Sequence, residues 1–154
     1  MKGFIKLTLL GAGLALAATG AMAQDDAVKA RRELMKNVSG KNAKLGSQLT
    51  KGELPYNAEI AKAAMMSIHE VPDKFVKMFP KGTDSDQEVE SEASPKIWTD
   101  MDGFLVAADK LKLASAAAAE AATKGPGQFA VAFESVFKAC KGCHDGYRVE
   151  KDKH

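Results

Sequence analysis

The chain has 154 residues, with 22 Lys and Arg, 20 Asp and Glu, and a formal net charge of +2 at pH 7. Lys2 and Lys6 supply this surplus within an N-terminal segment that has no acidic residue, so the remaining chain is neutral and gives no sign of nucleic-acid binding. Aromatic residues make up only 6%, alanine is abundant and β-branched runs are scarce, which favours one helical domain with a single core.

The first 23 residues have the pattern of a secretory signal peptide. Two lysines precede an apolar run from Leu9 to Ala18 that is too short to span a bilayer, and Ala21-Met22-Ala23 supplies a small-x-small cleavage site. An uncleaved N-terminal anchor is the alternative, but no stop-transfer pattern follows. We therefore predict cleavage before Gln24, which leaves an exported domain of residues 24–154 without a membrane span.

The first predicted helix covers residues 25–49. Its apolar residues fall on two heptad series, and the polar residues Arg31 and Asn42 interrupt the face that points inward. The apolar positions of the two series are Val28, Met35, Val38, Leu45 and Leu49. Burying the guanidinium of Arg31 is costly unless an anion lies beside it, so an anionic partner is expected there.

A linker at residues 50–56 separates this segment from the second, for which Asn57 is the expected N-cap. The second segment carries an apolar stripe as far as Met78, and Pro72 within it predicts a kink or a restart. Residues 80–94 are polar, acidic and aperiodic, so we expect a surface loop or a short mobile element there.

Ser94-Pro95 predicts the start of a third helix, because serine can cap exposed N–H groups and proline is tolerated in the first turn. Its inward face runs from Ile97 to Ala122, and the second half consists of small residues that let a neighbour approach closely. Gly125-Pro126-Gly127 ends this helix. The fourth segment then has one face made of Phe129, Phe133, Val136, Phe137, Cys140, Cys143, His144 and Tyr147.

Four segments of roughly 20 residues, each with one apolar stripe, predict an all-α, antiparallel up-down four-helix bundle. Strand-like alternation is nearly absent, and no internal repeat of fixed period is visible. The sequence contains no P-loop, no glycine-rich dinucleotide turn and no Gly-x-Ser-x-Gly elbow.

The only two cysteines stand in the sequence Cys140-Lys141-Gly142-Cys143-His144. A redox dithiol typically needs its first thiolate at a helix N-terminus, whereas this pair lies late in a predicted helix. A structural zinc site needs four ligands, and His69 and His154 are the only other histidines. A disulfide across one helical turn would close a very small loop and gain little stability.

A haem interpretation uses every residue of the motif. Cys140 and Cys143 lie one turn apart and can each add across a haem vinyl group to form a thioether, and His144 follows directly with an imidazole for the iron. Cys-x-x-Cys-His is the attachment signature of c-type haem. We therefore predict one covalently bound haem c per chain, with His144 as the proximal axial ligand of the iron.

These residues resemble the class II c-type cytochromes, the family of cytochrome c prime and its low-spin relatives. The resemblance covers essentially the whole of residues 24–154. It rests on the C-terminal position of the haem motif up to Arg148, and on the stretches 26–31, 52–56 and 94–98. It implies a four-helix bundle that carries haem c in the periplasm.

The resemblance places Met35 at the sixth coordination position, opposite His144. A thioether there would complete a His/Met pair, which favours low-spin iron and electron transfer. In some cytochrome c prime proteins the equivalent side chain, methionine included, only packs over an open iron, so both arrangements stay open. The residues around Met35 look more like the low-spin, His/Met-ligated branch. For Arg31, the resemblance implies contact with a haem propionate.

The leading interpretation is a periplasmic electron carrier, not an enzyme, that cycles Fe(III)/Fe(II) between unidentified redox partner proteins. The alternative is a five-coordinate haem protein that binds nitric oxide or carbon monoxide. A peroxidase would need an open iron and a distal acid–base group, and position 35 offers a methionine rather than a histidine. Because dimers are common in the family, the resemblance also allows a homodimer.

Overall fold

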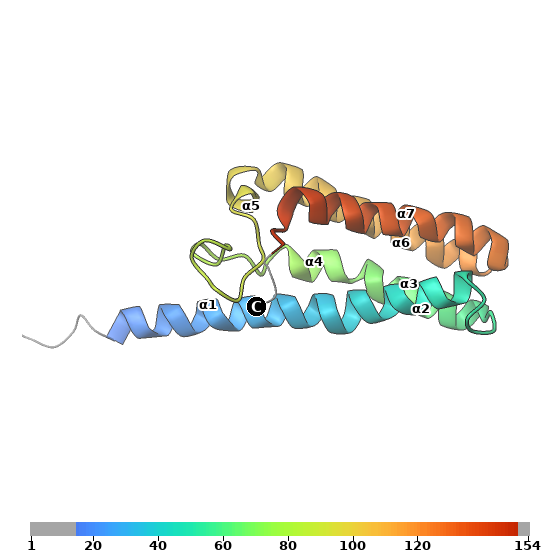
Figure 1. The fold of residues 1–154 in the computed structure, drawn as a ribbon, viewed down its shortest axis with the longest axis horizontal. Coiled ribbons are helices and arrows are strands. Elements are labelled where there is room, and N and C mark those ends of the chain that lie inside the picture. The colour runs from blue at the N-terminus through green and yellow to red at the C-terminus, as the bar shows by residue number, and fades with distance from the viewer. Residues whose placement is uncertain (1–14, 151–154) are drawn as a thin grey trace, which may run out of the picture.

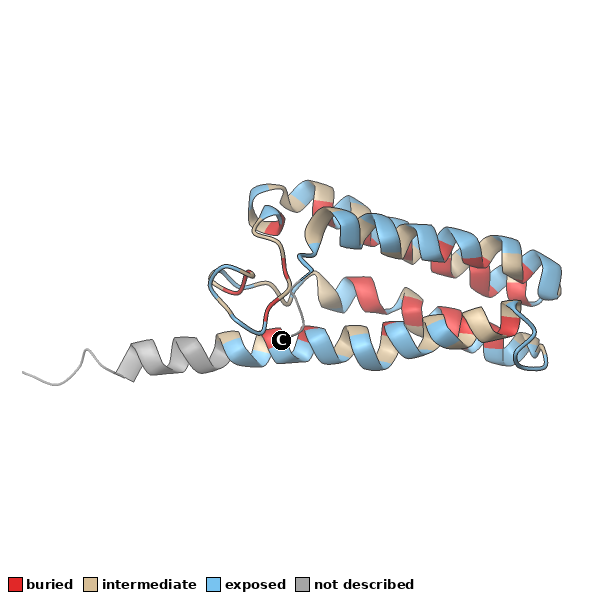
Figure 2. Ribbon diagram, viewed as in Figure 1, coloured by how far each residue is buried: buried red, intermediate tan, exposed pale blue. Residues whose placement is uncertain are grey.

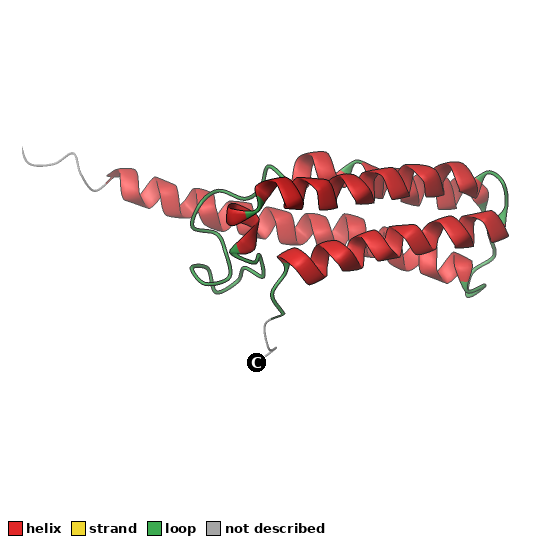
Figure 3. Ribbon diagram, turned by 90° about the horizontal axis from the view of Figure 1, so that it is seen from above, coloured by secondary structure: helices red, strands yellow, loops and turns green. Residues whose placement is uncertain are grey.

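The computed structural model describes residues 15–150, with side chains from Gln24 onward. Four long helical rods run antiparallel to one another along the molecule (Figures 1 and 3). Within the described residues, the only strand-like feature is an isolated bridge between Ala93 and Arg148. The prediction of an all-α up-down four-helix bundle is therefore confirmed.

The first rod consists of α1 (Ala15–Leu34), the π-helix η1 (Met35–Gly40) and α2 (Lys41–Thr50). The chain stays helical through both junctions, since Leu34 and Lys41 have φ/ψ of −61°/−46° and −66°/−43°. A π turn contains more residues than an α turn, so it moves the following side chains to a new face. The predicted leader, residues 1–23, lies outside the residues with described side chains.

The second rod consists of α3 (Ala58–His69) and α4 (Val71–Phe75). The predicted N-cap is confirmed, because the side chain of Asn57 accepts a hydrogen bond from the backbone N–H of Ile60 at 2.9 Å. The predicted restart is also confirmed, because Pro72 lies in the first turn of α4, immediately after the break at Glu70.

Residues 76–95 form the long loop between the second and third rods. Thr83 and Ser91 are both fully buried in it, and Asp84 is buried as well. The expectation of a simple surface segment is wrong for these residues, because two of them bind a buried side chain of α1.

The third rod begins with the short helix α5 (Lys96–Thr99) and continues as α6 (Met101–Ala122). The sequence predicted one helix, but Asp100 leaves the helical conformation with φ −138° and ψ 54°, and its carboxylate caps α6 by accepting from Gly103 N at 3.2 Å. The fourth rod, α7 (Pro126–Tyr147), starts after Gly125, whose φ of +116° suits glycine.

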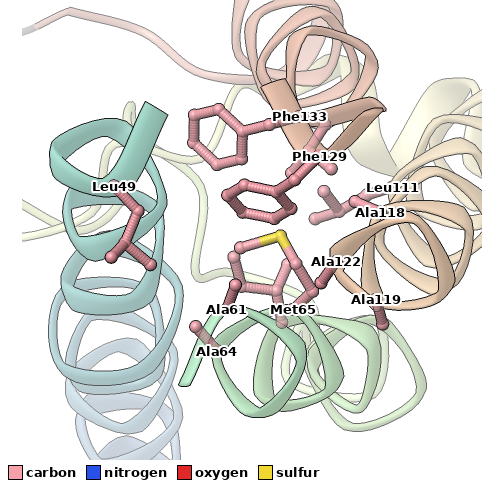
Figure 4. Packing of buried hydrophobic residues seen from close by; sticks show 12 residues of the cluster. Leu49, Ala61, Ala64, Met65, Leu111, Ala118, Ala119, Ala122, Phe129 and Phe133 are labelled. Carbon is pink, nitrogen blue, oxygen red and sulfur yellow. The ribbon is translucent and has the colours of Figure 1, made fainter. Parts of the chain in front are cut away.

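Buried residues follow the inward faces of the rods (Figure 2) and form two separate clusters. The Phe129 cluster comprises Leu49, Ala61, Ala64, Met65, Ile68, Leu111, Ala118, Ala119, Ala122, Phe129, Phe133 and Val136 (Figure 4). The Phe104 cluster comprises Ala93, Ile97 and Phe104, with Phe75, Val76, Phe79, Trp98, Met101, Cys143 and Tyr147 packed against them. The core of the bundle is therefore divided along its length.

Candidate haem site

The two cysteines lie one turn apart on α7, at the boundary between the two core clusters. Cys140 packs against the Phe129 cluster and Cys143 against the Phe104 cluster, and both are half-buried free thiols. Burial raises the pKa of Cys140, and burial together with Cys140 raises the pKa of Cys143 to about 11. Neither residue is the stabilised thiolate that a dithiol oxidoreductase uses. The pair suits attachment to a large apolar group that lies between the clusters.

His144 follows Cys143 on an exposed part of the last turns of α7. Partial desolvation of the ring lowers its pKa, and the nearby charge of Arg148 adds to the effect. Both influences favour the neutral imidazole, which is the form that binds metals. In the described part of the chain, no cluster of three or more His, Cys, Asp or Glu side chains is placed to hold a metal. A protein-only zinc site is therefore not present there, whereas iron in a porphyrin needs only axial ligands from the protein.

Phe137 adds an apolar surface beside these residues. It lies one turn before Cys140 and two turns before His144 on α7, and it is 65% exposed. The sequence placed Phe137 on the buried face, so this exposure is a difference from the prediction. A large aromatic side chain left open beside a half-buried thiol indicates a surface that an apolar partner covers. The side chains present fit a haem.

Met35 is half-buried and is the first residue of η1, in the first rod, which contacts α7 through α2. The π segment packs on α2 and α3, whereas α7 packs mainly on α6. The structure thus places Met35 and the cysteine–histidine motif on different walls of the bundle. Short π segments inside α-helices occur frequently at functional sites, and no pattern in the sequence marks this one.

Arg31 lies one turn before Met35, and its guanidinium is buried in contacts with the 76–95 loop. Its Nη1 donates to Met78 O at 3.1 Å and to Thr83 Oγ1 at 2.8 Å. Its Nη2 donates to Thr83 O and to Ser91 Oγ, the latter at 2.6 Å. The guanidinium carbon also lies 4.7 Å from the ring centre of Phe79. Loop groups therefore occupy the position for which the sequence predicted an anion, and the propionate contact stays a prediction.

Burial lowers the pKa of Arg31 to about 10, although the charges of Asp84 and Glu88 act in the opposite direction. The residue remains a cation at neutral pH, and the loop supplies the compensation for its burial. Because Thr83 and Ser91 are distant in sequence from Arg31, the periodicity of the helix could not reveal these partners.

The far end of the same loop binds the end of α7. Ser94 N donates to Tyr147 O at 3.0 Å, and Val149 N donates to Glu92 O at 2.8 Å. The side chain of Arg148 donates from Nε to Glu92 Oε2 at 2.7 Å. The loop thus connects the helix that carries Met35 with the helix end that carries His144.

Trp98 lies in α5, at the start of the third rod. In the described part of the chain, its Nε1 and Ser39 Oγ are the two buried side-chain polar atoms without a hydrogen-bond partner. No signal in the sequence marks an unpaired indole, because pairing is a property of the folded molecule.

A cavity of about 370 Å³ lies between α6 and α7, and Gly103 and Gly142 are among the residues that line it. Cys143 and Tyr147 line it together with Lys96, Lys110 and Lys138.

No helix in the described range is long and apolar enough to cross a membrane.

Comparison with known proteins identifies the family. The family profile described as Cytochrome C' matches residues 26–148. Cytochrome c-556 of Agrobacterium tumefaciens (strain apple 185) is 33% identical over 123 residues, which are 80% of this chain and 94% of that protein. Cytochrome c' of Pararhodospirillum photometricum is 36% identical over 122 residues, which are 79% of this chain and 94% of that protein.

Solved structures agree with this result. Cytochrome c' from Rhodobacter Spheriodes superimposes with a TM-score of 0.77 at 29% identity, covering 83% of this chain and 98% of that one. A nitric oxide complex of a leucine variant of cytochrome c prime from Alcaligenes xylosoxidans superimposes with a TM-score of 0.72 at 26% identity, covering 82% and 97%. The chain belongs to the cytochrome c' family of class II c-type cytochromes, and it is a haem c protein of the electron-transferring or gas-binding kind.

Proposed function

We propose that this protein is an electron carrier in which His144 and Met35 are the two axial ligands of a haem c held by Cys140 and Cys143. The observation that carries this proposal is the position of Met35, a thioether at the first residue of a π segment in the first rod, on a different wall of the bundle from the cysteine–histidine motif. Cytochromes c-556 stand beside cytochromes c' among the relatives, at 33% and 36% identity.

The haem, when bound, supplies a one-electron Fe(III)/Fe(II) couple. Cys140 and Cys143 would hold the haem by adding across its two vinyl groups, each forming a carbon–sulfur bond while the thiol hydrogen goes to the other vinyl carbon. His144, fixed beside them on α7, would offer the nitrogen lone pair of its neutral ring to the iron. Phe137, which is exposed here, would be covered by the bound haem.

Whether Met35 binds the iron decides between an electron carrier and a gas-binding haem protein. If its sulfur bound the iron, it would raise the reduction potential and prevent small molecules from binding at that position. The same side chain packed without a bond would leave that position open.

The second candidate function is the binding of nitric oxide or carbon monoxide at an open iron. It is favoured by the structural neighbours, among which two leucine variants of cytochrome c prime from Alcaligenes xylosoxidans are complexes with nitric oxide. Those proteins are 26% identical to this chain, and position 35 here is a methionine.

The proposal includes export to the periplasm with cleavage before Gln24, because the N-terminal sequence has a positive segment, an apolar run and a small-x-small site. Its redox partners are unidentified periplasmic proteins, and a homodimer remains part of the prediction. The N-terminal residue of the purified mature protein tests the cleavage site.

Absorption and EPR spectra of the purified holoprotein test the axial ligation. His/Met ligation gives a low-spin ferric signal and a sulfur-to-iron charge-transfer band. Met35→Ala then removes that band, gives high-spin iron and allows carbon monoxide to bind, while the haem stays covalently attached.

Met66→Ala is the matched control, because Met66 is an exposed methionine on α3. Its spectra should equal those of the unaltered protein. High-spin ferric iron in the unaltered protein, or carbon monoxide binding that Met35→Ala does not change, would reject the electron-carrier proposal in favour of the gas-binding one.

A further inference from the structure

Trp98 has a buried hydrogen-bond donor without a partner in the protein. Its Nε1 is inaccessible to solvent and has no acceptor among the described residues. Leaving a buried N–H group unpaired costs about 1–3 kcal/mol, so native proteins pair nearly all such groups. The Nε1–H group of Trp98 therefore calls for a hydrogen-bond acceptor that does not belong to the described protein residues.

The surroundings of Trp98 connect it to the haem attachment residues. Trp98 packs against the Phe104 cluster, to which Cys143 also belongs. Its ring meets that of Phe79 edge-to-face at 5.9 Å, and Phe79 in turn meets Phe104 at 5.0 Å. The unpaired donor therefore lies in the same aromatic wall as one of the two cysteines.

The other polar side chains of this wall already have partners. Tyr147 donates its hydroxyl to Asp100 Oδ2 at 2.8 Å, and Oδ1 of the same carboxylate accepts from Gly103 N at 3.2 Å. The guanidinium of Arg31, which lies over the ring of Phe79, is bound to the loop through Thr83 and Ser91. The indole N–H of Trp98 is the buried donor of the wall that remains available.

A haem c bound at Cys143 would bring acceptors of only one kind. Its four pyrrole nitrogens are bound to iron, so its propionate oxygens are the groups that can accept a hydrogen bond. We propose that the Nε1–H of Trp98 donates a hydrogen bond to a haem propionate. A charge-assisted bond of this kind is stronger than a neutral one, and it would orient the haem from the end opposite its thioether links.

This assignment gives a function to the break at Asp100. If α5 and α6 were one helix, α5 would continue the line of α6; Asp100 leaves the helical conformation between them, so α5 and its Trp98 are placed separately. The inference depends on haem binding alone, so it holds whether or not Met35 binds the iron.

The chain contains a single tryptophan, so one indole signal reports on the bond without ambiguity. In the ¹H–¹⁵N spectrum of the reduced holoprotein, made diamagnetic with carbon monoxide if Met35 does not bind the iron, the Nε1–H signal should be shifted downfield and should exchange with solvent at least about tenfold more slowly than a free indole. Trp98→Phe keeps the ring and removes the donor. In that variant the propionate bending band of the low-frequency resonance Raman spectrum should shift.

Tyr147→Phe is the matched control, because it removes a hydroxyl from the same wall whose partner is Asp100. Its propionate band should not move. An indole N–H that exchanges as fast as a free indole would overturn the proposal without any need for a variant. An unchanged propionate band in Trp98→Phe would also overturn it, since the indole would then be paired with water or with the protein.

Discussion

Arg31 shows how one buried charge can join two segments that are distant in the sequence. The cost of burying a cation predicted an anionic partner, and the structure instead supplies four hydrogen bonds from the loop and an aromatic face. The Cys-x-x-Cys-His motif could be recognised because its chemistry lies within five consecutive residues. The partners of Arg31 and the unpaired donor of Trp98 could not, because both depend on which residues the fold brings together.

Replacing Arg31 by methionine should cost about 3–5 kcal/mol in the free energy of unfolding of the holoprotein, because the loop hydroxyls and carbonyls lose a charged donor at a buried site. Denaturant unfolding followed by far-UV circular dichroism measures this loss. Arg32→Met is the control, since Arg32 forms an exposed ion pair with Glu90 and its loss should cost less than about 1 kcal/mol. Equal losses in the two variants would contradict the structural role of Arg31.

Helix boundaries were predictable where a residue type forces them, and they were missed where tertiary contacts decide. Asn57, Pro72 and Gly125 mark their boundaries through capping, a restricted φ and a positive φ, respectively. The π segment that begins at Met35 and the break at Asp100 have no such marker. The break at Asp100 depends on a carboxylate that binds both α6 and α7, which only the fold brings together.

Gly46 is the element-scale contact that fixes α2 against α7. A methyl group at this position would come within 2.4 Å of Phe133 Cε2, a ring atom inside the Phe129 cluster. Gly46→Ala should therefore lower the free energy of unfolding by about 1–3 kcal/mol through overpacking. Gly127→Ala is the control, because nothing lies within 4 Å of the added methyl, and its unfolding midpoint should not fall. A Gly46→Ala protein as stable as the unaltered chain would show that α2 and α7 do not meet at this position.

Asp100 joins the start of α6 to the end of α7 and predicts a dependence of stability on pH. The hydrogen bond from Tyr147 lowers the pKa of Asp100, partial desolvation opposes this shift, and Gly103 N–H adds to the lowering. A carboxylate with a lowered pKa in the folded state contributes stability above its unfolded pKa of about 3.9, and this contribution is lost as the pH falls through the folded value. Asp100→Asn should therefore be less stable at neutral pH and approach the unaltered protein below about pH 4. Thermal unfolding across this range measures the difference, and a gap that does not change with pH would contradict the carboxylate's role.

At the scale of the whole molecule, the two separate core clusters lead us to expect that bound haem stabilises the folded protein. Cys140 borders one cluster and Cys143 the other, while Phe137 stays exposed beside them. A haem attached to both sulfurs would cover apolar surface on both clusters and join them, and a group that binds only the folded state stabilises it.

The chain with Cys140→Ser and Cys143→Ser should keep most of its far-UV helical signal. It should unfold at a lower temperature and lose near-UV signal from the aromatic wall around Phe104. Cys140→Ser alone, which keeps one thioether, should lie between the two. If the double variant unfolded at the same temperature and as cooperatively as the holoprotein, the two clusters would be stable without the haem, and its role would be limited to redox or ligand chemistry.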